Sequence, residues 1–219
     1  MRVVIAGGHG KIARLLEREL AGRGDTPVGL IRNLDHAAAL RAAGAQPVAC
    51  DLERAGLDDV AAHLRGADAA VFAAGAGPGS GAARKDTVDR AAAVLLADAA
   101  QAAGVRRYLL VSSMGVDQPP GPGSDDVWAA YLTAKKAAED DVRGRDLDWT
   151  VLRPGRLTDD PPTGRITLAP HVEPGAVTRT DVARVLVALL YHPGTAGAVL
   201  ELVGGDTPIA DAVAAAEAR

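Results

Sequence analysis

A tyrosine and a lysine spaced four residues apart give this chain a pair that could perform acid–base chemistry. Tyr131 and Lys135 lie in the run Tyr-Leu-Thr-Ala-Lys, within a stretch that we predict to be helical, so both side chains share one helix face. A free phenol has a reference pKa of about 10, and a nearby ammonium group favours its ionised form. We therefore expect Tyr131 to transfer a proton and Lys135 to tune it.

Hydroxyl and carboxyl side chains elsewhere in the sequence could complete this pair. Ser112 and Ser113 end a strand-like run, where a hydroxyl could hold a carbonyl oxygen. The sequence itself does not separate the two serines, so either could take this role. Asp89 lies on a long predicted helix, and two roles stay open for it. It could accept a hydrogen bond from a water molecule near Lys135, or it could attach its helix to a neighbouring loop.

A glycine-rich turn at the start of the chain predicts a site for a dinucleotide. Residues 1–6 read as a buried strand, Gly-Gly-His-Gly follows at 7–10, and residues 11–20 have the apolar spacing of a helix. This arrangement directs backbone N–H groups and a positive helix end at one point, which suits a pyrophosphate. Ala13 stands where a third glycine is usual. The residues expected to bind the cofactor here are Gly7, Gly8, His9, Gly10, Lys11 and Ile12.

The end of the second predicted strand favours NADP(H) over NAD(H). An acidic residue there would bind the ribose 2′-hydroxyl of NAD, but this chain has Arg32 and Asn33. A guanidinium group can hold a 2′-phosphate through two parallel hydrogen bonds. His9 either approaches that phosphate or caps its own turn. By their position in the fold, the other expected cofactor contacts are Asp51 and Leu52 beside the adenine, Ala73, Ala74 and Gly75 along the cofactor backbone, and Ser112, Lys135, Pro154 and Gly155 near the nicotinamide.

Strand-like and helix-like runs alternate along almost the whole chain. This rhythm predicts an α/β fold of the Rossmann type, a doubly wound parallel sheet in three layers. We expect a single domain over residues 1–219, with a small substrate-side region at about residues 155–180. Three loops, at 75–81, 115–124 and from 159 onward, follow strand ends and would form the rim of one site. The predicted strands are 3–6, 28–31, 47–49, 69–73, 108–112, 150–152 and 199–202, and the predicted helices are 11–23, 35–43, 57–64, 87–103, 127–143, 180–190 and 209–216.

Composition argues against several other classes of protein. The net charge of the 219 residues is −4 and no long basic block occurs, so neither nucleic acid nor a membrane surface is an expected partner. The single cysteine cannot form an internal disulfide, and the histidines do not show metal-ligand spacing. We expect a cytoplasmic monomer or homodimer without a bound metal, because no signal peptide or membrane span is visible.

Taken together, these motifs resemble the short-chain dehydrogenase/reductase superfamily. The order Gly-Gly-x-Gly, Arg-Asn, Asp-Leu, Ala-Ala-Gly, Val-Ser-Ser, Tyr-x-x-x-Lys and Arg-Pro-Gly is most similar to its atypical NAD(P)H-binding branch, which includes NAD(P)-dependent epimerases and is similar to NmrA-like regulators and to flavin and biliverdin reductases. The resemblance implies an NADP(H)-dependent oxidoreductase acting on a small carbonyl or conjugated acceptor. A non-catalytic NADP(H) sensor is the alternative, followed by a nucleotide-sugar epimerase or dehydratase. The resemblance also favours Ser113 as the catalytic serine, with Ser112 as the alternative. Better-known branches carry an asparagine in their catalytic tetrad, where this chain has Asp89.

Overall fold

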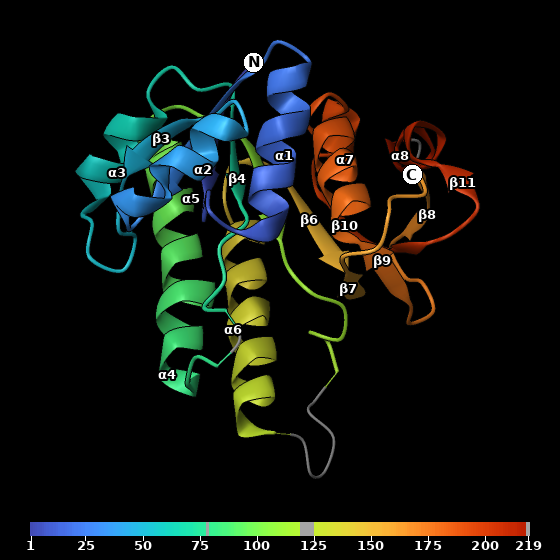
Figure 1. Cartoon of the computed structure of the whole chain (residues 1–219). Helices are drawn as coiled ribbons and strands as arrows, with labels where there is room; N and C mark the ends of the chain where they lie inside the picture. Colours follow the sequence, from blue (N-terminus) through green and yellow to red (C-terminus); the bar gives the residue numbers. More distant parts are fainter. Residues whose placement is uncertain (78, 119–124, 218–219) are drawn as a thin grey trace.

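The chain folds around one large sheet with helices on both faces (Figure 1). The computed structural model describes residues 1–77, 79–118 and 125–217. Within them the sheet has nine strands in the order β11-β8-β10-β6-β5-β4-β1-β2-β3. Seven of these strands run parallel to one another: β1 (Arg2–Ala6), β2 (Thr26–Ile31), β3 (Gln46–Ala49), β4 (Ala69–Phe72), β5 (Arg107–Val111), β6 (Asp148–Pro154) and β10 (Ala198–Gly204). Strand β8 (Arg165–Ala169) is antiparallel to both β10 and β11 (Thr207–Pro208).

The helices bury one apolar face each against the two sides of this sheet. One side packs against α1 (Lys11–Gly22), α7 (Arg179–Leu190) and α8 (Ile209–Glu217), and the other against α3 (Leu57–Leu64), α5 (Ala92–Ala102) and α6 (Asp126–Arg143). Shorter elements are α2 (Ala37–Ala42), α4 (Ala82–Arg84), the 3-10 turns η1 (Leu34–His36) and η3 (Pro193–Thr195), and the π-helix η2 (Lys85–Ala91). The predicted doubly wound α/β fold is confirmed. No helix among the described residues combines the length and apolarity needed to cross a membrane.

Strand register brings the carboxyl ends of the central strands to one edge. Ala6, at the end of β1, lies beside Leu30 of β2 and Phe72 of β4. The strand order reverses at β1, because β2 follows it on one side and β4 on the other. Open α/β sheets bind ligands outside such a reversal point. The edge that carries the glycine turn is therefore where a site is expected.

The region after β6 is more regular than its sequence indicates. We expected a long irregular stretch from residue 159, and this was wrong. The stretch contains β8 and β9 (Ala176–Thr178), and β9 pairs with β7 (Arg156–Thr158) in a separate two-stranded sheet. Prolines at 161, 162, 170 and 174 interrupt the alternation of apolar and polar residues, so this alternation did not predict the short strands. Pro78 and residues 119–124, within two of the expected rim loops, lie outside the described residues.

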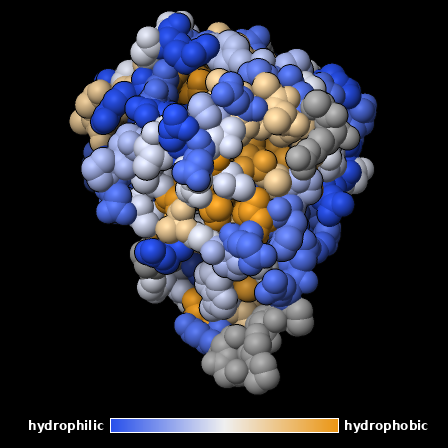
Figure 2. All heavy atoms as spheres, turned by 90° about the vertical axis from the view of Figure 1, so that its right-hand side faces the viewer, coloured by the Kyte–Doolittle hydropathy of each residue, from blue (hydrophilic) through white to orange (hydrophobic). Residues whose placement is uncertain are grey.

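Apolar side chains also reach the surface formed by the C-terminal part of the chain. Figure 2 shows them near the middle of that face, bordered by hydrophilic residues. A cavity of about 390 Å³ lies between β8, β10 and α8 and is lined almost wholly by apolar residues, among them Leu168, Val199 and Leu200. No residue of the glycine turn lines this cavity.

A buried glutamate on α1 lies directly behind that turn. Glu17 is fully buried, and neither carboxylate oxygen has a hydrogen-bond partner among the described residues. A Cβ atom on Gly29 would lie 2.5 Å from its Oε1, and one on Gly8 would lie 3.0 Å from the same atom. Burial raises the pKa of Glu17 to about 8, and the positive charge of Arg14 offsets this only in part.

Replacing Glu17 with glutamine should therefore stabilise the protein at neutral pH. The folded state holds the proton of Glu17 more tightly than the unfolded state, so wild-type stability falls as the pH rises from 4.5 towards 8. A pKa difference of one corresponds to about 1.36 kcal/mol, so the gain at pH 7 is about 3 kcal/mol. Urea unfolding of both proteins at pH 5 and pH 7 measures the gain and its dependence on pH. Glu19→Gln, on the same helix but in a partly exposed pair with Arg184, is the control. The same pH dependence in wild type and Glu17→Gln would contradict the expectation.

Candidate functional site

Two clefts adjoin at the carboxyl edge of the sheet. The smaller has a volume of about 260 Å³ and the larger about 1160 Å³. Both are lined by Ala73, Ala74 and Gly75, which follow β4, so these residues form their common wall. The smaller cleft lies over the ends of β1, β2 and β3, and the larger over the ends of β5 and β6. An extended molecule could therefore occupy both.

Glycines shape the smaller cleft by allowing backbones to approach closely. Gly7 has a φ of +77°, and a Cβ atom on it would lie 2.6 Å from Cα of Ala74. The amide of Gly10 donates to the carbonyl of Gly7 at 2.8 Å, which closes the turn just before α1 begins. The remaining amides at the start of α1 have no partner within the helix. This turn is a cradle with a positive helix end, and it fits the pyrophosphate of a dinucleotide.

Charged side chains surround the outer end of the smaller cleft. The guanidinium groups of Arg32 and Arg84 converge on the carboxylate of Glu53, at 3.5 and 2.6 Å respectively. The hydrogen bond from Arg84 holds the pKa of Glu53 below its ordinary value. The rings of His9 and His36 stack here with centroids 3.6 Å apart, and burial together with His36 lowers the pKa of His9. Two arginines and two imidazoles thus meet where the sequence placed only Arg32 and His9.

The larger cleft brings Tyr131, Lys135 and Asp89 together. Lys135 is buried, and its Nζ donates to the carbonyl of Val111 at 3.0 Å. The same Nζ lies 3.3 Å from Oδ1 of Asp89 and 5.9 Å from the centroid of the Tyr131 ring. Asp89 also accepts a hydrogen bond from the amide of Ala76, in the loop after β4. Asp89 therefore contacts the lysine and fastens its helix to the loop at the same time.

The two serines at the end of β5 differ in their surroundings. Ser112 is buried, and within the described residues its Oγ has no hydrogen-bond partner. Ser113 is half-buried, and its Oγ donates to the carbonyl of Met114 at 3.1 Å. Both line the larger cleft. A buried hydroxyl without a partner is a group that a bound molecule can satisfy.

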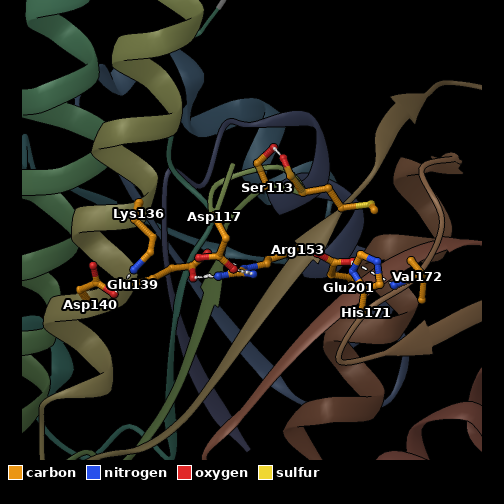
Figure 3. Close-up of polar contacts among 10 residues, drawn as sticks. Ser113, Asp117, Lys136, Glu139, Asp140, Arg153, His171, Val172 and Glu201 are labelled. Atoms are coloured by element: carbon orange, nitrogen blue, oxygen red, sulfur yellow. Dashed lines mark hydrogen bonds and ion pairs between the residues drawn. The ribbon is translucent and has the colours of Figure 1, made fainter. Parts of the chain in front are cut away.

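Two groups of charged residues, drawn in Figure 3, lie near this cleft. Arg153 of β6 donates to Glu139 of α6 and to Asp117 of the loop after β5. Burial opposes the charge on Arg153, but these two hydrogen bonds outweigh it and raise its pKa. On the other side of Arg153, buried Glu201 accepts from the amide of Val172 at 2.9 Å and lies 3.1 Å from Nδ1 of His171. The contacts of Arg153 tie β6 to α6 and to the loop after β5, and those of Glu201 tie β10 to the segment that contains His171 and Val172.

Most residues predicted for the site line one of the clefts. Gly7, His9, Gly10, Arg32, Asp51 and Leu52 line the smaller, Asp89, Ser112, Ser113, Tyr131, Lys135, Pro154 and Gly155 line the larger, and residues 73–75 line both.

Four predicted residues line neither cleft. The backbone of Gly8 packs on that of Gly29, and Ile12 is half-buried against the core. Lys11 is exposed and pairs with Asp159 at 2.6 Å, and Asn33 caps η1 by accepting from the amide of Asp35.

Reasoning from sequence missed several residues of the clefts. These are His36, Glu53, Arg84, Lys85, Trp128, His171, Arg179 and Glu201. Lys85 carried one usable signal, because the chain has only four lysines. The others come from several separate elements, among them Glu201 of β10, and only the tertiary fold brings them together.

Comparison with known proteins relates this geometry to a known family. A family model described as NAD(P)H-binding matches residues 7–193. A Bacillus subtilis (strain 168) protein named uncharacterized sugar epimerase YhfK is 32% identical over 97% of this chain and 99% of its own length. The structure of a Bacillus halodurans protein, provisionally named an NAD-dependent epimerase/dehydratase, is 36% identical with a TM-score of 0.91, covering 98% of this chain and 99% of that one. ChuY, an anaerobillin reductase from Escherichia coli O157:H7, is 28% identical with a TM-score of 0.74, covering 94% and 98%.

Proposed function

This chain belongs to the NAD(P)H-binding family, and from that premise we propose that it is an NADP(H)-dependent oxidoreductase for a small carbonyl or conjugated acceptor. The observation that carries the proposal is the meeting of the two clefts at residues 73–75. A cradle suited to a dinucleotide opens there into the cleft that contains Tyr131, Lys135 and both serines. The cofactor and an acid–base group would thus lie within reach of one substrate.

The chain's own residues supply the proton and hold the reactants. A bound nicotinamide cofactor supplies the hydride. Tyr131 donates the proton of its hydroxyl to the substrate oxygen. Lys135, held by Asp89 and the carbonyl of Val111, keeps a positive charge beside that phenol as the proton leaves. Ser113 orients the substrate oxygen, while the hydroxyl of Ser112, which has no hydrogen-bond partner among the described residues, is available to the cofactor.

We expect Arg32 to select NADP(H) by binding the 2′-phosphate together with Arg84. Glu53 does not mark an NAD site, because it follows β3 and already accepts from Arg84 and Thr87. Arg32→Ala should weaken NADPH binding about tenfold or more and leave NADH binding unchanged, since a hydrogen bond to a charged group contributes about 1.5–3 kcal/mol. Calorimetric titration measures both affinities. Arg54→Ala, an exposed neighbour that lines neither cleft, should change neither. Equal losses for NADPH and NADH in Arg32→Ala would reject the role of Arg32.

Turnover tests the enzymatic part of the proposal. NADPH oxidation is followed by absorbance with aldehydes, ketones, quinones and conjugated enones as acceptors. Sustained oxidation with at least one acceptor supports the proposal. Tight NADPH binding without oxidation of any acceptor would favour a sensor instead. Because two relatives carry epimerase names, nucleotide sugars are included and their products analysed for inverted stereochemistry.

A further inference from the structure

Lys85 is a buried cation in the larger cleft that the proposed reaction does not use. It begins the π-helix η2, is 8% exposed, and lines the same cleft as Tyr131. Its Nζ donates to the carbonyl of Gly77 at 3.1 Å and lies 5.5 Å from the centroid of the Tyr131 ring. Within the described ranges, no carboxylate forms an ion pair with it.

A buried ammonium group without a counter-ion is unfavourable. Two other cations that line this cleft each have a carboxylate nearby. Lys135 has Asp89 at 3.3 Å, and Arg179 has Asp159 at 2.7 Å. Lys85 has three N–H donors and one carbonyl acceptor among the described residues. The face of the Tyr131 ring offsets only part of the cost of removing the charge from water. An anion that enters with a ligand would complete the pairing.

The acidic residues of the cleft are engaged elsewhere or lie exposed. Asp89 contacts Lys135 and the amide of Ala76, and Glu201 contacts His171 and the amide of Val172. Asp125 caps α6 by accepting from the amide of Val127, and Glu173 is exposed at the rim. None of them forms an ion pair with Lys85.

The backbone conformation around Lys85 supports a functional role for this residue. A π-helix carries an extra residue in its turn, is rare, and occurs frequently at functional sites. In η2 it places Lys85, Val88 and Asp89 in buried positions. One element thus supplies both the carboxylate that contacts Lys135 and the second ammonium beside Tyr131.

An aromatic surface lies next to this cation. The Trp128 ring stacks on that of Tyr131 with centroids 5.2 Å apart, lines the cleft, and is 49% exposed. We propose that Lys85 binds a carboxylate of the substrate while Trp128 packs on its ring, so that the acceptor is a planar conjugated acid. This rests on the proposed function for the reaction, but the binding itself can be measured without turnover.

A matched pair of unreactive ligands tests the proposal. The NADP⁺-saturated protein is titrated by calorimetry with 2-naphthoate and with 2-naphthamide, which have similar shape and differ in charge. We expect 2-naphthoate to bind about tenfold more tightly, as is typical of a charge-assisted hydrogen bond. Lys85→Met should remove this preference and Lys85→Arg should retain part of it. Lys136→Met is the control, because Lys136 lies on α6, pairs with Asp140 and does not line the cleft.

Several results would overturn the proposal. For the wild-type protein, two results would do so: equal affinities for the two ligands, or no binding of 2-naphthoate. Both results are obtained without any variant, so they do not depend on whether a variant folds. In Lys85→Met, a preserved preference would do the same, and so would a parallel loss of NADP⁺ affinity, which would make Lys85 a cofactor ligand. Preference for naphthoate that depends on Lys85, without NADPH oxidation of any acceptor, would support this site and reject the reductase. Turnover of neutral acceptors, without a preference for 2-naphthoate over 2-naphthamide, would support the reductase and reject the carboxylate site at Lys85.

Discussion

Tyr131→Phe is expected to lower kcat at least about 100-fold with the best acceptor of the panel, because general acid catalysis contributes about 10²–10⁴. The change removes one hydroxyl and keeps the ring that stacks on Trp128 and lies near two ammonium groups. The cleft should therefore keep its shape. Steady-state kinetics and NADPH titration on the same preparation measure the two effects separately.

A loss that affects kcat alone distinguishes a role of Tyr131 in proton transfer from a structural role. NADPH affinity and thermal stability should match those of the wild type, so that the loss is confined to kcat. Tyr191→Phe is the control, because that phenol is partly exposed and donates to Asp25, away from both clefts. Unchanged kcat in Tyr131→Phe would remove the proposed mechanism and leave the cofactor site intact.

Gly7→Ala is expected to abolish measurable NADPH binding and to destabilise the fold. At a φ of +77° a side chain strains the backbone, by about 1–2 kcal/mol. In addition, the new Cβ atom would lie 2.6 Å from Cα of Ala74, so the wall shared by the two clefts must move. Overpacking of this kind typically costs about 1–3 kcal/mol more. Urea unfolding and NADPH titration report the two consequences.

A control variant at a second glycine separates the effect of backbone strain from that of the close approach to Ala74. Gly24 has a φ of +85°, in the turn between α1 and β2, and a Cβ atom on it would meet nothing within 4 Å. Gly24→Ala should therefore show the backbone strain alone, with NADPH affinity unchanged. If both variants bound NADPH as well as the wild type, the glycine turn would not be the cradle for the cofactor.

The fold was predictable because the features that specify it are local. Each buried strand is a short apolar run, and each helix shows an apolar stripe, so their alternation predicted the parallel sheet. Tyr131 and Lys135 followed from the same reasoning, because four residues on a helix bring two side chains to one face. The strand ends that carry Arg32 and Ser113 could be located for the same reason.

The features that could not be predicted depend on the tertiary structure. Arg84 ends the short helix α4 and Lys85 begins a π-helix, whereas periodicity of 3.6 residues predicted only an ordinary helix starting at residue 87. Glu17 follows directly on the apolar pair Leu15 and Leu16, and nothing local shows that its carboxylate is buried with no partner in the described part of the chain. The pairing of Glu53 with both arginines joins three separate segments of the chain, so no sequence spacing reveals it.

The central claim is that one edge of the sheet binds the cofactor and presents its reactive end to Tyr131. A crystal structure of the complex with NADP⁺ tests it most directly. We expect the diphosphate at the amides that begin α1, the 2′-phosphate between Arg32 and Arg84, and the nicotinamide in the larger cleft beside Tyr131 and Lys135. A nucleotide bound away from the glycine turn, or a nicotinamide directed away from Tyr131, would contradict the account.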